Sequence, residues 1–161
     1  MPPKHLFYPR INAFRDETGA EIGSASSLWV LLDVNTRRIV NNEVVLAHLP
    51  DNGDMPAGAA PGVVRPLEGA AETRKLLPPY SDFDVNGHVN NTKYLDWASS
   101  ALGHERMAAN RLLEFTIIYD SEIRPGVEIH TELIRQDGRF TFCGSAGEKR
   151  CFSIGGVLGE R

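Results

Sequence analysis

A single amphipathic segment, residues 92–103, constrains the fold more than any other part of the sequence. Its apolar side chains recur at helical spacing, which places them in one stripe along a helix. Asn90 or Asn91 is suited to cap the start of this helix, and Gly103 is suited to end it. The segments around it have the composition of strands, so the stripe must be buried against a sheet. The stripe consists of Tyr94, Trp97, Ala98, Ala101 and Leu102.

Strands are predicted on both sides of this helix. Asp137-Gly138 is a hairpin turn signal between two of them. Pro78 and Pro79 cannot donate hydrogen bonds, so the strand before the helix is expected at a sheet edge. This order predicts an α+β fold in which one long central helix is wrapped by a curled antiparallel sheet. The expected strands are residues 74–80, 112–119, 127–135, 139–143 and 150–158.

The first forty residues also predict β structure. Residues 24–33 carry a nearly continuous apolar run around Trp29, as expected of a strand covered on both faces. Trp29 is therefore expected in a core. Residues 43–49 fit either a short helix or a strand, and residues 50–70 are rich in Gly, Pro and Ala and predict a linker. A further strand is expected within residues 6–14, and turns at 16–19 and 33–36.

The composition fits a folded, cytosolic domain. The chain has 161 residues, 42% of them hydrophobic, and 17 basic against 21 acidic side chains give a net charge of −4. That balance argues against a nucleic-acid partner, which requires a basic surface. The longest apolar run, Leu28–Leu32, is far below the ~20 residues that span a bilayer. The first residues lack the apolar region of a signal peptide, so a cytoplasmic location is expected.

Cys143 and Cys151 lie eight residues apart across a predicted hairpin. One disulfide between them is geometrically conceivable. Two free thiols are favoured, because the sequence shows neither a secretory signal nor a dense cysteine framework. No C-x-x-C spacing indicates a structural zinc site.

The loop before the helix, residues 81–91, concentrates the side chains that carry chemistry. In an extended segment Asp84, Asn86 and His88 share one face, and the N-terminus of the helix faces the same space. An imidazole can move a proton, a carboxamide can fix a carbonyl or a water, and backbone N–H groups can hold an oxyanion. Gly87 lets the backbone approach a ligand closely. This set suits acyl transfer, while the alternative is a polar surface loop with a helix cap.

The run Asp84-x-Asn86-x-His88-Val89-Asn90-Asn91-x-x-Tyr94 resembles the active-site signature of plant and bacterial acyl-acyl-carrier-protein thioesterases of the hotdog type. Residues 114–126 resemble the family's strand with its acidic catalytic position, and residues 14–38 resemble the end of its first hotdog repeat. Family members carry two repeats in a longer chain. The resemblance therefore implies a partial first repeat over 1–45, a linker over 46–73 and a complete hotdog repeat over 74–161.

The resemblance also implies a reaction, the hydrolysis of the thioester that joins a fatty acyl chain to the phosphopantetheine arm of acyl carrier protein. Glu122 would activate or orient a water, and Asn86 would position that water or the thioester carbonyl. His88 would transfer a proton and help to stabilise the oxyanion, and Asp84 would orient the set. No metal or redox cofactor is implied. The expected substrate-binding residues are Asn90, Asn91, Tyr94 and Trp97.

One departure from the family bears on the mechanism. Plant members carry a cysteine directly after the acidic residue, and this chain has Ile123 there. Because Cys143 and Cys151 lie in other predicted strands, attack by water is favoured over a covalent cysteine mechanism.

Several alternatives stay open. The same residues would also serve the hydrolysis of acyl-coenzyme A, and a shortened first repeat would fit a non-catalytic module that binds acyl chains or oligomerises. A homodimer would restore a second helix to the assembly. Tyr94 and Trp97 fit core packing as well as a substrate site. Arg106 and Arg111 fit either a basic rim for an acidic carrier or solvated surface charge.

Overall fold

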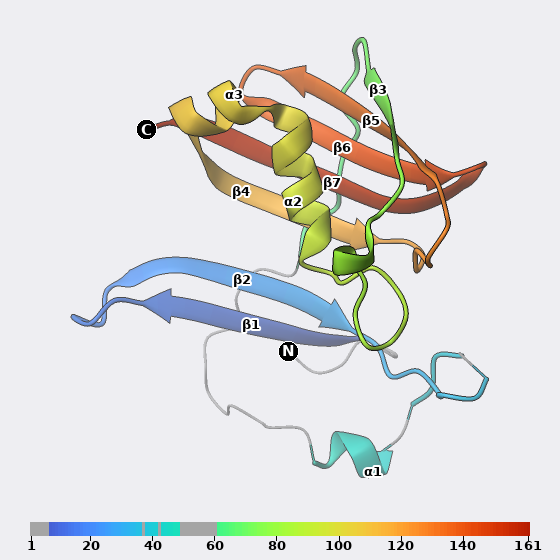
Figure 1. Cartoon of the computed structure of the whole chain (residues 1–161). Coiled ribbons are helices and arrows are strands. Elements are labelled where there is room, and N and C mark those ends of the chain that lie inside the picture. Colours follow the sequence, from blue (N-terminus) through green and yellow to red (C-terminus); the bar gives the residue numbers. More distant parts are fainter. Residues whose placement is uncertain (1–6, 37, 42, 49–60) are drawn as a thin grey trace. The chain divides into compact units, whose positions relative to one another are not determined.

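The computed structural model describes residues 7–36, 38–41, 43–48 and 61–161. The chain forms two compact units, Met1–Gly62 and Val63–Arg161, and each is described by itself (Figure 1). Residues 49–60 of the predicted linker lie outside the described part of the chain. The predicted limits of the two repeats stay a prediction.

The first unit contains a two-stranded antiparallel sheet. Strand β1 (Tyr8–Arg15) pairs with β2 (Glu21–Trp29). The predicted turn joins them, because the Asp16 carboxylate accepts hydrogen bonds from the N–H groups of Thr18 and Ala20, at 2.9 and 3.0 Å. Residues 43–49 were predicted to form either a short helix or a strand. The structure has a helix there, the single turn α1 (Glu43–Leu46).

The expectation of a strand covered on both faces around Trp29 is wrong. Strand β2 ends at Trp29 instead of reaching Asp33, and the side chains of Leu28 and Trp29 are each 51% exposed. The Trp29 ring lies 4.3 Å from the Arg10 guanidinium, and its indole N–H donates to the Ser27 hydroxyl at 2.8 Å. The apolar run is interrupted because Asp33 accepts hydrogen bonds from the following turn.

The second unit places one principal helix across a five-stranded antiparallel sheet with strand order β3-β5-β6-β7-β4 (Figure 1). The predicted α+β architecture is confirmed, with β3 at an edge as expected. Helix α3 was missed because it is short and buries none of its side chains. No described helix is long and apolar enough to cross a membrane. The elements are β3 (Glu72–Leu76), the 3-10 turn η1 (Tyr80–Asp82), α2 (Lys93–Leu102), α3 (His104–Ala109), β4 (Asn110–Tyr119), β5 (Ile129–Gln136), β6 (Arg139–Ala146) and β7 (Lys149–Glu160).

The core lies between the apolar stripe of α2 and the facing side chains of the sheet. Phe152 is fully buried, and its ring centroid lies 5.0 Å from Tyr94, 6.0 Å from Trp97 and 5.5 Å from Phe142. A Cβ atom at Gly144 would collide with the Phe152 ring. The absence of a side chain at Gly144 therefore leaves the space that the Phe152 ring of the paired strand occupies.

The hairpins and the cysteines follow the sequence predictions. Asp137 and Gly138 both have positive φ angles, 49° and 74°, as a two-residue hairpin turn requires. The last two strands extend further than predicted, because they are joined by a tight turn at Gly147-Glu148. Cys143 and Cys151 are free thiols, as expected.

The aromatic core gives a direct prediction of stability. Phe152→Ala leaves a cavity among three other aromatic rings and should lower the free energy of unfolding by about 3–5 kcal/mol. Urea unfolding of the full chain measures this loss. Tyr80→Ala is the matched control, because Tyr80 is 95% exposed and its truncation should cost under about 0.5 kcal/mol. Equal losses for the two variants would contradict this assignment of the core.

Candidate active site

The loop before α2 folds back on itself as a tight hairpin. Phe83 and Val89 form an antiparallel bridge, and the Asp84 N–H donates to the His88 carbonyl at 3.0 Å. The Gly87 N–H closes the turn onto the Asp84 carbonyl at 3.0 Å, and Gly87 has a φ of 74°. These features define a three-residue hairpin loop with glycine in the left-handed position.

The prediction that Asp84, Asn86 and His88 share one face of an extended segment is therefore wrong. The Asp84 carboxylate accepts the Asn86 N–H at 2.8 Å, and this local hydrogen bond favours a turn over an extended chain. The asparagine-glycine pair before His88 was the sequence signal for a turn. The turn nevertheless brings the side chains of Asp84 and His88 close together.

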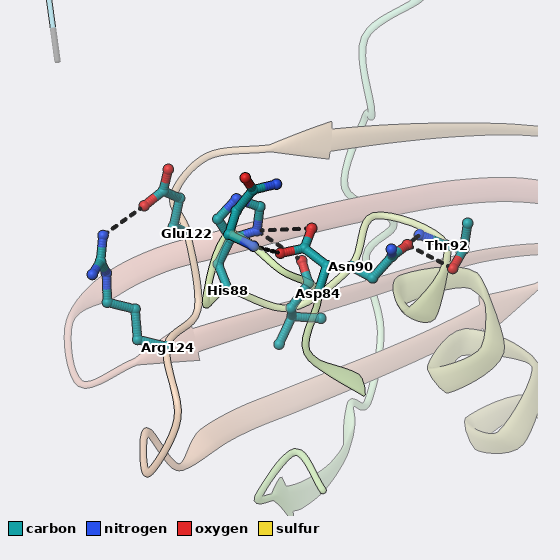
Figure 2. A network of polar contacts seen from close by, with 8 residues as sticks. Asp84, His88, Asn90, Thr92, Glu122 and Arg124 are labelled. Carbon is teal, nitrogen blue, oxygen red and sulfur yellow. Dashed lines mark hydrogen bonds and ion pairs between the residues drawn. The ribbon is translucent and has the colours of Figure 1, made fainter. Parts of the chain in front are cut away.

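Asp84 and His88 form the centre of this cluster (Figure 2). The His88 Nδ1 atom lies 3.7 Å from the Asp84 carboxylate, and both side chains are about one-fifth exposed. The same nitrogen lies 3.3 Å from the Val89 carbonyl oxygen. Both neighbours are acceptors, which assigns the ring proton to Nδ1 and the lone pair to Nε2 in the neutral imidazole.

Glu122 reaches the cluster from the segment that follows β4, since the strand itself ends at Tyr119. The Ile123 carbonyl accepts the Val89 N–H at 2.9 Å. This hydrogen bond joins the residue after Glu122 to the residue after His88. Figure 2 shows the Glu122 side chain and the Asp84–His88 pair in the same region. The Glu122 carboxylate is 40% exposed and pairs with the Arg124 guanidinium at 3.1 Å. Arg124 was not predicted, although its spacing from Glu122 was visible in the sequence.

The two asparagines at the start of α2 have different contacts. The Asn90 side chain accepts hydrogen bonds from the N–H and the hydroxyl of Thr92, at 3.0 and 2.8 Å, which is a local turn just before the helix. The N-cap residue of α2 is Thr92, without a side-chain capping hydrogen bond, so the prediction that Asn90 or Asn91 caps the helix is wrong. The Asn91 carbonyl accepts the Tyr119 hydroxyl at 3.0 Å. Tyr119, which sequence reasoning missed, thus joins the end of β4 to the start of the helix.

Tyr94 and Trp97 lie in the core, with 3% and 9% of their surface exposed, which confirms the packing interpretation for both. A substrate-binding role for either residue stays a prediction. The Trp97 indole N–H donates to the buried Asp82 carboxylate at 2.8 Å. Asp82 was also missed, although a core tryptophan normally requires an acceptor for its N–H group.

The phenol of Tyr94 is buried, and the charge of Glu122 contributes to its pKa. Burial raises the pKa of Tyr94 to about 12, and the nearby Cys151, Tyr119 and Glu122 add smaller contributions in the same direction. Burial also raises the pKa of Tyr119. Both phenols therefore remain protonated at neutral pH and can act as hydrogen-bond donors.

Within the described residues, no three His, Cys, Asp or Glu side chains gather closely enough to hold a metal ion. An open surface hollow of about 580 Å³ lies at the C-terminal end of α2, away from the His88 loop, and Arg106 and Arg135 contribute to its lining. Arg106 is thus placed at the opposite end of α2 from the loop that carries Asp84 and His88.

Solved structures show the fold of the chain. A 12:0-ACP thioesterase from Umbellularia californica superposes with a TM-score of 0.81 at 21% identity, over 99% of this chain and 65% of that one. An acyl-ACP thioesterase from Bacteroides thetaiotaomicron gives a TM-score of 0.72 at 23% identity, over 96% and 63% of the two chains. These similarities confirm the predicted hotdog fold.

Sequence comparison establishes the family. Residues 67–149, just over half of the chain, match the family model of the acyl-ACP thioesterase C-terminal domain, so the chain belongs to this family. A palmitoyl-acyl carrier protein thioesterase of Cuphea hookeriana is 31% identical over 113 residues, 65% of this chain and 27% of the relative. An oleoyl-acyl carrier protein thioesterase of Arabidopsis thaliana is 32% identical over 116 residues, 65% and 32% of the two chains. The chain thus spans about a quarter to a third of the length of these curated relatives.

The left-handed conformation of Gly87 gives a prediction about the hairpin. A Cβ atom added at Gly87 would meet no heavy atom within 4 Å, so backbone strain alone decides the effect. Gly87→Val should lower the free energy of unfolding by about 1–2 kcal/mol, and Gly87→Asn should cost clearly less because asparagine tolerates this region. Urea unfolding compares the two variants. Equal losses would show that the turn adopts another conformation.

The raised pKa of Tyr94 predicts a pH dependence of stability. The folded state keeps the proton up to about pH 12, whereas the unfolded state loses it near the ordinary tyrosine pKa of 10.0. Stability from this group is complete below pH 10 and is lost as the pH rises toward 12. Tyr94→Phe should therefore show a shallower fall of unfolding free energy over this interval than the wild-type chain. An unchanged slope would contradict the burial of the phenol.

Proposed function

We propose that this chain hydrolyses fatty acyl thioesters, with the acyl chain carried on the phosphopantetheine arm of acyl carrier protein. The observation that carries the proposal is the hairpin that sets Asp84 3.7 Å from His88. The hydrogen bond from the Val89 N–H to the Ile123 carbonyl, which joins this hairpin to the segment of Glu122, supports the role of Glu122. Membership of the acyl-ACP thioesterase family supports it.

His88 is the proton-transfer group in this proposal. The acceptors around Nδ1 hold the proton on that nitrogen, so Nε2 accepts a proton from the attacking water. Asp84 stabilises the imidazolium that forms, because its carboxylate lies beside Nδ1. Asp84 is itself fixed, since it also accepts the Asn86 N–H.

Glu122 orients or activates the water together with His88. Its carboxylate is exposed enough to reach solvent and is held by Arg124. Water adds to the thioester carbonyl carbon, the carbon–sulfur bond breaks, and the proton taken by His88 passes to the thiolate. Free fatty acid and the phosphopantetheine thiol are the products. Asn86 positions the water or the carbonyl oxygen, and donors near the start of α2 stabilise the oxyanion.

The locations of the two cysteines favour attack by water over attack by a thiol. The residue after Glu122 is Ile123, which is 1% exposed. Cys151 is buried in β7, and the thiol of Cys143 lies on the neighbouring strand β6. Neither cysteine belongs to the hairpin or to the Glu122 segment.

The choice of carrier is the part of the proposal that rests most on relatives. The names of the Cuphea and Arabidopsis relatives specify acyl carrier protein as the carrier. Acyl-coenzyme A hydrolysis by the same residues is the second candidate, because the two substrates share the phosphopantetheine thioester. A cytoplasmic location and a homodimer remain predictions from the sequence.

Release of free thiol tests the activity. The full chain should release thiol from medium-chain or long-chain acyl-acyl carrier protein faster than from the corresponding acyl-coenzyme A. His88→Ala and Glu122→Ala should each lower kcat roughly 100- to 10,000-fold, the range that general acid–base groups contribute. His104→Ala and Glu105→Ala are matched controls, because both residues are exposed at the start of α3, and they should retain the wild-type rate.

The outcomes separate the alternatives. Faster hydrolysis of acyl-coenzyme A would support the second candidate. Saturable binding of an acyl chain without turnover would replace the enzyme by a binding module. Wild-type rates in both His88→Ala and Glu122→Ala would refute the assigned residues.

A further inference from the structure

Asp82 is a buried carboxylate to which the proposed chemistry gives no role. Its residue surface is only 7% exposed, and one carboxylate oxygen accepts the Trp97 indole N–H at 2.8 Å. Burying a carboxylate is costly unless it is hydrogen-bonded. The Trp97 N–H compensates part of that cost, so the two side chains form a fixed link between the loop and the second turn of α2.

The main chain of Asp82 connects both sides of the catalytic hairpin. Its carbonyl accepts the Asn90 N–H at 2.8 Å, and its N–H donates to the Pro79 carbonyl at 3.0 Å. The next pair along the hairpin is the bridge between Phe83 and Val89. Asp82 therefore stands at the base of the hairpin, where its backbone joins the two strands and its side chain attaches them to the helix.

We propose that Asp82 is a positioning residue, which holds the Asp84–His88 hairpin in register with α2 through its hydrogen bond to Trp97. Its effect on catalysis rests on the proposed thioesterase function. A hairpin of this size has little packing of its own, since Val85 and Asn86 are exposed. Release of its base would displace Asp84 and His88 relative to Glu122, and small displacements of reacting groups are costly in rate.

An electrostatic role for the Asp82 charge is the competing explanation, and asparagine distinguishes the two. Asp82→Asn removes the charge but keeps an oxygen that can accept the Trp97 N–H. If Asp82 positions the hairpin, Asp82→Asn should retain most of the rate of thioester hydrolysis and Asp82→Ala should lose it. Trp97→Phe removes the donor and keeps an aromatic ring, so it should resemble Asp82→Ala.

The test combines kinetics with native-state hydrogen exchange on the full chain. With acyl-acyl carrier protein as substrate, Asp82→Ala should lower kcat roughly 10- to 100-fold and change KM much less. Without substrate, the Val89 and Asn90 amides should exchange roughly 10- to 100-fold faster in Asp82→Ala, as loss of a buried charged hydrogen bond implies. Thr131→Val is the matched control. It removes a buried hydroxyl that donates to the Arg74 carbonyl at 3.2 Å on the sheet, and it should leave both kcat and these two amides unchanged.

Each result decides the proposal. Wild-type exchange at Val89 and Asn90 in Asp82→Ala would overturn the positioning role, whether or not the chain is active. Loss of rate in Asp82→Asn equal to that in Asp82→Ala would overturn it in favour of the charge. An inactive wild-type chain would refute the proposed function instead, and the exchange data would still support or overturn the link between Asp82 and the hairpin.

Discussion

Burial of the aromatic stripe of α2 against the sheet is the interaction on which the second unit depends. Tyr94 and Trp97 both contact Phe152 at ring-centroid distances of 5.0 and 6.0 Å, and Phe152 itself lies on β7, next to the middle of the sheet. Edge-on and tilted arrangements of this kind fix the rotation of a helix as well as its distance from the sheet. The rotation decides where the start of α2 lies, and the hairpin with Asp84 and His88 is attached to that start.

Polar contacts then organise the loop that the helix positions. The carboxylates of Asp82 and Asp84 and the amide of Asn90 each accept hydrogen bonds from nearby groups. The Tyr119 hydroxyl and the Ile123 carbonyl add contacts from the segment after β4. The loop before α2 and the segment after β4 are far apart in sequence. The candidate site therefore forms only when the helix and the sheet have packed together. Its geometry is therefore a property of the tertiary fold and not of the motif alone.

The elements with strong periodicity could be predicted from the sequence. The helix, its Gly103 terminus and the Asp137-Gly138 hairpin all follow from local preferences that the packing reinforces. Failures occurred where a local hydrogen bond opposed the pattern. Asp33 ended the apolar run after Trp29, and Asp84 converted an expected extended segment into a turn.

The candidate site was predictable as a set of residues but not as a geometry. The motif located Asp84 and His88 correctly on one loop. The contacts of Asp82 with Trp97 and of Tyr119 with Asn91 could not be predicted, because they join residues of separate elements, 15 and 28 residues apart. The pairing of Arg124 with Glu122, two residues apart, depends on the course of an irregular segment.

The segment after β4 shows why a nucleophilic cysteine is poorly suited to the position after Glu122. Along this segment the Glu122 and Arg124 side chains reach solvent, whereas Ile123 between them is 1% exposed and belongs to the core cluster. A side chain at position 123 therefore points inward, away from the carboxylate that it follows. Apolar surroundings raise the pKa of a thiol and disfavour the thiolate that would have to attack. The exposed acid therefore fits the activation of water in the proposed function, whereas position 123 serves the packing of the core.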